Sequence, residues 1–289
     1  MTITRQPKYR RNKSTGVFIL SFVLLLLSVR IADAAGVRAT PQFLFQDSKD
    51  KSTRVTISNP SDQNVEVWLE MKYGFHVSDD TGSIIIVNPE TLGPDDHSSA
   101  QWIHAFPERF NLGPHESQVV RLVVTPPPGI MPSEYWARII VSSKDQQRPH
   151  VKGKTGFGSS IEIITSTSLP FHYRYGSTNT GLQLIRPIET ANLANSFRIL
   201  TPLRRTGNGS FWGMLSCKIL SSSGKIVFTN DYKLVIYKDF TFAIKIDRGL
   251  IPPGSYNLEL TAKAERTDFD RSHLLHIEPI TWTVPINIL

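Results

Sequence analysis

The sequence is poor in cysteine, with Cys217 as the single thiol among 289 residues. One thiol cannot form an internal disulfide, so the fold must be stabilised by hydrophobic cores. In the segment GMLSCKIL, Cys217 alternates with Leu215 and Ile219, which places it on the apolar face of a strand. We therefore expect a buried and unreactive thiol, with a catalytic or intermolecular cysteine as the alternative.

Sustained helical periodicity between capping residues is also absent after the first 34 residues. Short β-rich runs recur instead, separated by turn residues such as Asn59-Pro60-Ser61-Asp62 and Gly207-Asn208-Gly209. The strands expected in the first half are Gln42–Phe45, Arg54–Ser58, Val65–Tyr73, Ser83–Val87, Ala100–Ala105, Gln118–Val124 and Tyr135–Ser142. Those expected in the second half are Ser196–Leu200, Phe211–Leu220, Lys225–Thr229, Tyr232–Val235, Phe240–Ile246, Ser255–Lys263 and His273–Ile286. Short antiparallel strands at this spacing predict an immunoglobulin-like sandwich in each half.

The basic charge of the chain is concentrated in its first residues. A basic head (Arg5 to Lys13) precedes the apolar run VFILSFVLLLLSV (17–29) and the small residues of ADA (32–34). This pattern predicts a secretory signal peptide over residues 1–34, and with it export through the Sec pathway. The run is too short to cross a bilayer, which needs about 20 apolar residues. We expect no stable membrane insertion, with an uncleaved anchor as the alternative.

A basic surface for nucleic acid is missing once the leader is set aside. The leader holds six of the 32 Lys and Arg residues and one of the 25 Asp and Glu residues. The rest therefore carries 26 basic and 24 acidic side chains, a net charge of about +2. Since no basic cluster with interleaved aromatic residues remains, nucleic acid is not an expected partner.

Motifs for catalysis and for metal binding are scarce as well. There is no Gly-x-Ser-x-Gly elbow. Asp95-Asp96-His97 and the segment from Asp268 to His273 carry liganding atoms, but in turn-like segments without a complementary set of His or Cys. We expect no catalytic residue, no metal and no cofactor.

The most informative segment is IEIITSTSLPFHY (161–173). Apolar or small side chains alternate with mostly polar ones, which predicts a half-buried strand. Pro170 cannot donate a hydrogen bond to a ladder, so the strand should lie at a sheet edge or end there. A long edge strand with an apolar face invites pairing with another chain. The alternative is an ordinary sandwich strand whose edge is covered by a neighbour.

Four segments, in this order, resemble the PapD-like family of periplasmic pilus-assembly chaperones. They are KSTRVTISNPSDQNVEVWLEM (51–71), FNLGPHESQVVRLVV (110–124), EYWARIIVSS (134–143) and SLPFHYRYG (168–176). The likeness covers about 140 residues and extends to the second half only by architecture. It implies that the segment starting at Ile161 is the family's seventh strand, which fills the groove of an incomplete pilin sandwich by β-augmentation.

The resemblance implies particular roles for several residues. The donor residues would be Ile161, Ile163, Thr165, Thr167 and Leu169. The side chains of Thr165 and Thr167 would fill less of a subunit's groove than the larger aliphatic side chains usual in the family. Arg174 matches an arginine that braces the two domains.

The chain departs from the family at the site that anchors a subunit's C-terminal carboxylate. The family uses an arginine on its first strand and a lysine near the end of its seventh, because a buried carboxylate needs cationic partners. Alignment places Gln42 at the arginine position and Pro170 at the lysine position, and Arg38 is the nearest alternative cation.

The sequence therefore predicts an all-β protein with two immunoglobulin-like sandwiches in tandem, over residues 35–175 and 176–289, after a signal peptide. The leading hypothesis is a non-catalytic periplasmic chaperone for exported, pilin-like β-sandwich subunits, with an outer-membrane usher as a further candidate partner. A structural or adhesive envelope protein with the same fold is the alternative, favoured by the missing cation pair. An envelope hydrolase is a third hypothesis, with only scattered polar residues behind it.

Overall fold

The computed structural model describes residues 36–93, 96–146, 162–193, 195–268 and 270–288. The expected signal peptide and Ile161, the first expected donor residue, lie outside the described residues. Within the described ranges, no helix is long and apolar enough to cross a membrane.

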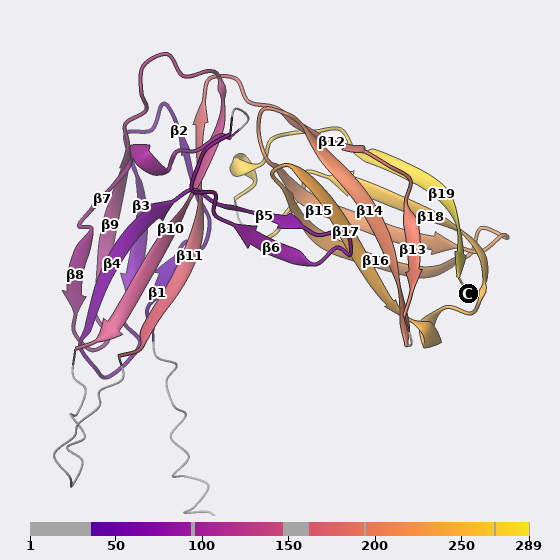
Figure 1. The fold of residues 1–289 in the computed structure, drawn as a ribbon, viewed down its shortest axis with the longest axis horizontal. Helices are drawn as coiled ribbons and strands as arrows, with labels where there is room; N and C mark the ends of the chain where they lie inside the picture. The colour runs from indigo at the N-terminus through magenta and orange to yellow at the C-terminus, as the bar shows by residue number, and fades with distance from the viewer. Residues whose placement is uncertain (1–35, 94–95, 147–161, 194, 269, 289) are drawn as a thin grey trace, which may run out of the picture. The chain divides into compact units, whose positions relative to one another are not determined.

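The first half of the chain forms a β-sandwich of two sheets (Figure 1). One sheet has the order β1 (Arg38–Thr40), β3 (Thr53–Ser58), β9 (Ser117–Val124) and β7 (Ile103–Phe106). The other has the order β2 (Leu44–Asp47), β11 (Ile164–Tyr175), β10 (Ser133–Asp145), β4 (Val65–Lys72) and β8 (Arg109–Leu112). A hairpin of β5 (Phe75–Ser78) and β6 (Ile84–Val87) projects from this sandwich (Figure 1).

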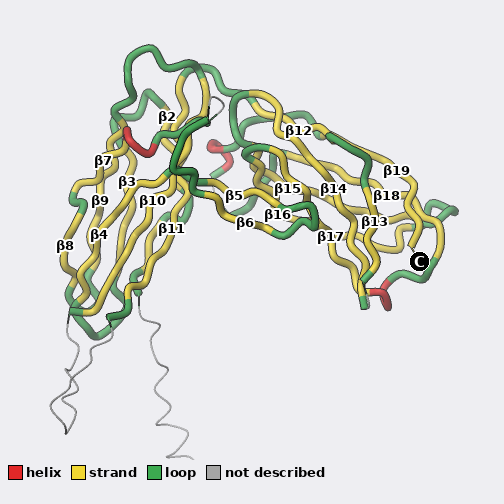
Figure 2. The backbone as a smooth tube through the Cα atoms, viewed as in Figure 1, coloured by secondary structure: helices red, strands yellow, loops and turns green. Residues whose placement is uncertain are grey.

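The second half forms another sandwich, also built from two sheets. In one sheet, β14 (Ser196–Gly207) pairs with β12 (Thr180–Leu184), β13 (Glu189–Asn192) and β17 (Asp239–Asp247). The other has the order β16 (Ile226–Ile236), β15 (Phe211–Leu220), β18 (Gly254–Lys263) and β19 (Ile280–Ile288). Helix among the described residues is limited to the short 3-10 turns η1 (Ala100–Trp102), η2 (Arg248–Leu250) and η3 (Arg271–His273), drawn red in Figure 2. The predicted all-β, two-sandwich fold is confirmed.

Each sandwich has its own hydrophobic core, made by the inward-facing residues of its two sheets. Val55, Val120 and Ile139 are among the fully buried residues of the first core. Cys217 lies in the second core and is completely buried, as predicted. Burial raises the pKa of its thiol to about 12, because the thiolate would be poorly solvated there.

Several of the expected strands have different limits in the structure. The start of Ala100–Ala105 is the turn η1, closed by a hydrogen bond from Trp102 N to Ser99 O. The start of His273–Ile286 is η3 and loop, because Asp270 caps the turn by accepting from Ser272 N. The two runs expected between residues 225 and 235 are the single strand β16, since Asn230 and Asp231 stay paired with β15. Strands β1, β5, β8, β12 and β13 were not predicted.

The β5–β6 hairpin packs against strands of the second sandwich. Thr241 N on β17 donates to Ser78 Oγ at 2.5 Å. His76 Nε2 forms a hydrogen bond with Val235 O on β16 at 2.7 Å. Gly82, at the turn with φ of 78°, lies so close to Ala243 that no side chain fits there. The hairpin is thus fixed by polar contacts near its strands and by backbone proximity at its turn.

Candidate functional site

The outer edge of β11 is open over half of its length. On one side, β11 pairs with β10 from Ile164 to Tyr175. On the other side, the parallel strand β2 pairs only with residues Phe171 to Arg174. Among the described residues, no strand pairs with the outer edge from Ile164 to Pro170. The edge is open because the N-terminal segment changes sheets, with β1 pairing to β3 and only β2 reaching β11.

The predicted donor residues occupy different environments along this edge. Ile163, just before β11, is 55% exposed, and Thr167 is also exposed. Thr165 is half-buried against Gly36. Leu169 is only 2% exposed, because it packs into the core of its own sandwich beside Phe171. The alternation predicted from the sequence is present, and its accessible part runs from Ile163 to Thr167.

The three anchor candidates line one cavity of about 570 Å³ beside the open edge. Arg38, Gln42 and Pro170 all contribute to its wall. Arg138, which is not among the site residues expected from the sequence, also lines this cavity. Arg138 lies on β10 directly opposite Pro170 in the strand register. The structure therefore places a guanidinium beside Pro170.

Arg138 is a nearly buried cation. It is 9% exposed, and its Nε donates to Ser168 Oγ at 2.7 Å. Burial lowers the pKa of its guanidinium, since a charge is costly away from water. Among the described residues, no carboxylate lies within ion-pair distance of it. A signal for it existed in the sequence, where a single charge interrupts the apolar run YWARIIV (135–141).

Arg174 contacts residues of both sandwiches. Its Nε donates to Glu134 Oε2 at 2.8 Å, and its Nη2 donates to His273 O at 2.8 Å. Glu134 is completely buried and also accepts hydrogen bonds from His172 Nδ1, at 3.0 Å, and from Ser210 N, at 3.1 Å. Arg174 thus forms hydrogen bonds with residues of both sandwiches.

The Glu134 carboxylate is stabilised in its charged form. Burial by itself raises the pKa of this carboxyl, but the His172 ring and the Arg174 guanidinium outweigh burial and hold the pKa well below its usual range. Ser210 Oγ also donates to Glu134, so the carboxylate stands between the serine and the histidine. This order lacks the bond between nucleophile and base that a hydrolytic triad needs.

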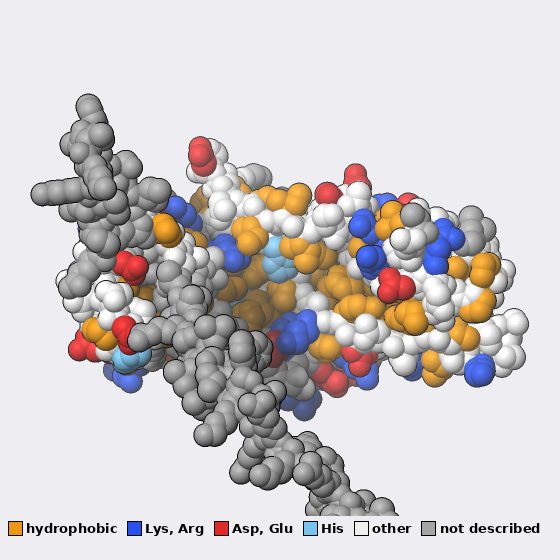
Figure 3. All heavy atoms as spheres, turned by 90° about the horizontal axis from the view of Figure 1, so that it is seen from below, with side chains coloured by type: hydrophobic (Ala, Val, Ile, Leu, Met, Phe, Trp, Pro, Cys, Tyr) orange, Lys and Arg blue, Asp and Glu red, His pale blue; other side chains and the backbone are white. Residues whose placement is uncertain are grey.

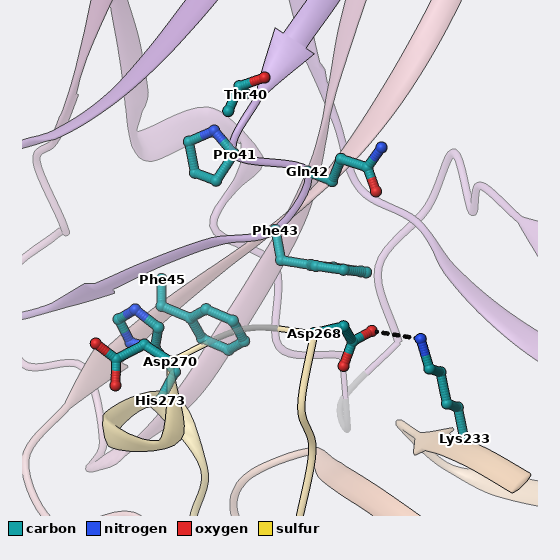
Figure 4. Close-up of a pocket in the computed structure, with 9 residues that line it drawn as sticks. All are labelled: Thr40, Pro41, Gln42, Phe43, Phe45, Lys233, Asp268, Asp270 and His273. Carbon is teal, nitrogen blue, oxygen red and sulfur yellow. Dashed lines mark hydrogen bonds and ion pairs between the residues drawn. The ribbon is translucent and has the colours of Figure 1, made fainter.

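Described aspartates of the two acidic motifs form hydrogen bonds and ion pairs with other side chains. Asp96 accepts from Tyr73 Oη at 2.9 Å and pairs with Lys238 at 2.6 Å, while Asp95 lies outside the described residues. Asp268 pairs with Lys233 at 3.0 Å, as Figure 4 shows. Among the described residues, no group of three or more His, Cys, Asp or Glu side chains could hold a metal ion.

Aromatic rings surround the described network at the junction of the sandwiches. The Phe45 ring stacks on His273 at 4.7 Å and on His172 at 4.9 Å between centroids. Phe43 and Phe45 line a cavity of about 640 Å³ together with Asp268, Asp270 and His273 (Figure 4). Viewed from below in Figure 3, hydrophobic side chains gather in the hollowed centre of the described surface.

Comparisons with known proteins give similarities at the level of structure. No family model matches the chain, and no curated protein matches its sequence. The CupB2 chaperone of Pseudomonas aeruginosa is 9% identical, with 85% of this chain and 98% of that chain covered and a TM-score of 0.40. The E. coli chaperone DraB is 15% identical, with 78% and 91% covered and a TM-score of 0.36.

A further similar structure is the CsuC–CsuE chaperone–tip adhesion subunit pre-assembly complex of Acinetobacter baumannii. The matched chain is 13% identical, with 86% of this chain and 98% of that chain covered and a TM-score of 0.42. At these identities the similarity concerns the fold.

Proposed function

We propose that this protein is a non-catalytic, chaperone-like protein of the periplasm that binds exported, pilin-like β-sandwich subunits through the outer edge of β11. The observation that carries the proposal is the unpaired edge from Ile164 to Pro170. An open edge presents unpaired N–H and C=O groups to an incoming strand, and the alternate side chains Ile163, Thr165 and Thr167 lie on one face of it. An outer-membrane usher remains a further candidate partner.

We also propose that Arg138 takes part in anchoring the subunit's terminal carboxylate. The resemblance implies two cations, where the alignment offers Gln42 and Pro170. Arg138 reaches the same cavity from the neighbouring strand, and Arg38 lines it as well. A carboxylate would supply the counter-ion that Arg138 lacks among the described residues, and such charge-assisted hydrogen bonds are strong. In this proposal, Arg138 on β10 supplies the positive charge that Pro170 cannot supply.

The test of the edge uses two neighbouring isoleucines on opposite faces of the strand. Ile163→Asp puts a charge on the face proposed to enter the subunit, and Ile164→Asp puts one on the other face. The two side chains are 55% and 52% exposed, so the substitutions are matched in burial. We expect Ile163→Asp to abolish co-purification of an exported β-sandwich subunit and Ile164→Asp to retain it. Equal capture of that subunit by both variants would sink the edge-donation proposal.

A structural or adhesive role in the cell envelope is the second candidate, and the presence of Pro170 where the family has a lysine favours it. The two functions differ in what happens to the complex. A chaperone is released when its subunit assembles, whereas a structural protein stays in the assembly at fixed stoichiometry. Quantifying this chain in isolated surface assemblies distinguishes the two, since a stoichiometric amount there indicates the structural role.

A further inference from the structure

Strand β6 exposes three consecutive isoleucines. Ile84, Ile85 and Ile86 are 67%, 47% and 53% exposed. Single exposed apolar residues are ordinary, but a contiguous group on a protein surface often marks a binding site. Because side chains alternate along a strand, Ile84 and Ile86 share one face and Ile85 lies on the other. The face of Ile84 and Ile86 lines a cavity.

This cavity, which we call the hairpin cavity, has a volume of about 240 Å³. The rings of Phe43, Trp212 and Tyr237 line it together with the isoleucines. His76, Val235, Arg138 and Pro170 are the other lining residues. Arg138 and Pro170 also line the 570 Å³ cavity beside the open edge of β11. The two cavities therefore adjoin at Arg138, with an apolar chamber on one side and the edge on the other.

The lining fits a ligand that carries an anionic group next to an apolar group. The hairpin cavity is smaller than the roughly 300–1,000 Å³ typical of whole small-molecule sites, so it suits a single bulky side chain. Arg138 is nearly buried and has no carboxylate partner among the described residues, so an anion complements it. In a polypeptide, only the last residue carries an α-carboxylate on the same carbon as its own side chain.

We infer that the hairpin cavity binds the side chain of the subunit's last residue, and that this residue is bulky and apolar, such as Phe, Leu or Met. Arg138 binds the α-carboxylate of the same residue, while the preceding residues pair with β11. The inference rests on the proposed function and adds a specificity to it: the protein selects its subunits by the chemistry of the terminal side chain. Ile84 and Ile86 of the β5–β6 hairpin contact this side chain and so distinguish apolar from other terminal residues.

The test uses labelled synthetic peptides of alternating Thr and Val with a free or an amidated C-terminus, titrated against the protein without its leader by fluorescence anisotropy. One peptide ends in Phe and a matched one ends in Ala. Burying a large apolar side chain predicts that the Phe acid binds about 10- to 100-fold more tightly than the Ala acid. Arg138→Met should remove the preference for the free acid over the amide.

The matched variants lie on the same strand. The double substitution Ile84→Ser/Ile86→Ser should bring the affinities for the Phe and Ala peptides within about threefold of each other, because it removes the apolar side chains that the Phe ring would contact on β6. Ile85→Ser, on the opposite face of β6, should leave the discrimination unchanged. Equal binding of the two peptides by the unmodified protein, or discrimination that persists in the double variant, would overturn the inference.

The outcomes also separate this inference from the proposed function. In one outcome, Ile163→Asp abolishes the binding of all the peptides, while the unmodified protein binds the Phe and Ala peptides equally. Edge donation is then supported, and the hairpin cavity has no selective role. If Ile163→Asp leaves peptide binding intact, edge donation itself fails. Absence of binding to all the peptides would count against both.

Discussion

The buried carboxylate of Glu134 joins groups from both sandwiches. It accepts from His172 and Arg174 on β11 and from Ser210, just before β15. The ring of His172 continues the network through a hydrogen bond between its Nε2 and Tyr237 Oη at 3.1 Å. Because these hydrogen bonds converge on one charge, its removal leaves several buried donors without an acceptor.

Glu134→Gln should lower the free energy of unfolding by about 3–5 kcal/mol, the usual cost of removing one partner from a buried ion pair. The pKa of this carboxyl is depressed in the folded state, so its contribution is present above the unfolded-state pKa of about 4.3 and is lost as the pH falls through the folded pKa. Urea unfolding measured across the acidic range should therefore show a steeper loss of stability in the unmodified protein than in the variant.

The control for this prediction is Asp239→Asn. Asp239 also pairs with an arginine, Arg204, at 2.7 Å, but both side chains are about half exposed. Solvent screening limits such a pair to about 0–1 kcal/mol. A similar loss in both variants would contradict the role assigned to the buried carboxylate.

At the same scale, the sequence located some of the important residues and missed others. The burial of Cys217 followed from its alternation with Leu215 and Ile219, which is a local property. The position of Arg138 opposite Pro170 depends on the register of β10 against β11, which the sequence does not state. Ser210 also joins Glu134 from a distant part of the chain, so the network could not be assembled from local patterns.

Among the elements, β11 and the β5–β6 hairpin define the proposed binding surface from two sides. The alternation in 161–173 predicted a half-buried strand, and the structure places Leu169, Phe171 and Tyr173 in the first core. The length of the open edge could not be predicted, because it depends on where the N-terminal segment leaves one sheet for the other. Of the two hairpin strands, only β6 was predicted from the sequence, because only β6 shows a clear β-rich run.

The attachment of the hairpin turn can be tested by comparing two glycines with the same backbone conformation. Gly82 and Gly129 both have φ of 78°, but a Cβ on Gly82 would meet Ala243, whereas a Cβ on Gly129 would meet nothing within 4 Å. Either substitution by Ala incurs about 1–2 kcal/mol of left-handed strain. Gly82→Ala should cost about 1–3 kcal/mol more, owing to overpacking against β17.

Urea unfolding of both variants, followed by tryptophan fluorescence, provides the comparison. An equal loss of stability in the two variants would show that the hairpin turn does not stay packed against β17 in solution.

For the whole molecule, the two sandwiches supply different parts of one proposed surface. The first contributes the edge of β11, the Arg138 guanidinium and the hairpin, while the second contributes Trp212 and Tyr237 to the wall of the hairpin cavity. The sequence predicted two all-β sandwiches because turn residues and short β-rich runs recur in both halves. It could not predict the cavities, since each is lined by residues far apart in the chain.

The central claim is that the outer edge of β11 pairs with a strand of an exported subunit. Amide hydrogen exchange of the protein, free and bound to a co-purified β-sandwich subunit identified by mass spectrometry, tests it most directly. In the free protein, the amides between Ile164 and Leu169 that point away from β10 should exchange rapidly, because no strand pairs with them. In the complex these amides should become protected. Rapid exchange that persists there, with new protection confined to another surface, would contradict the account.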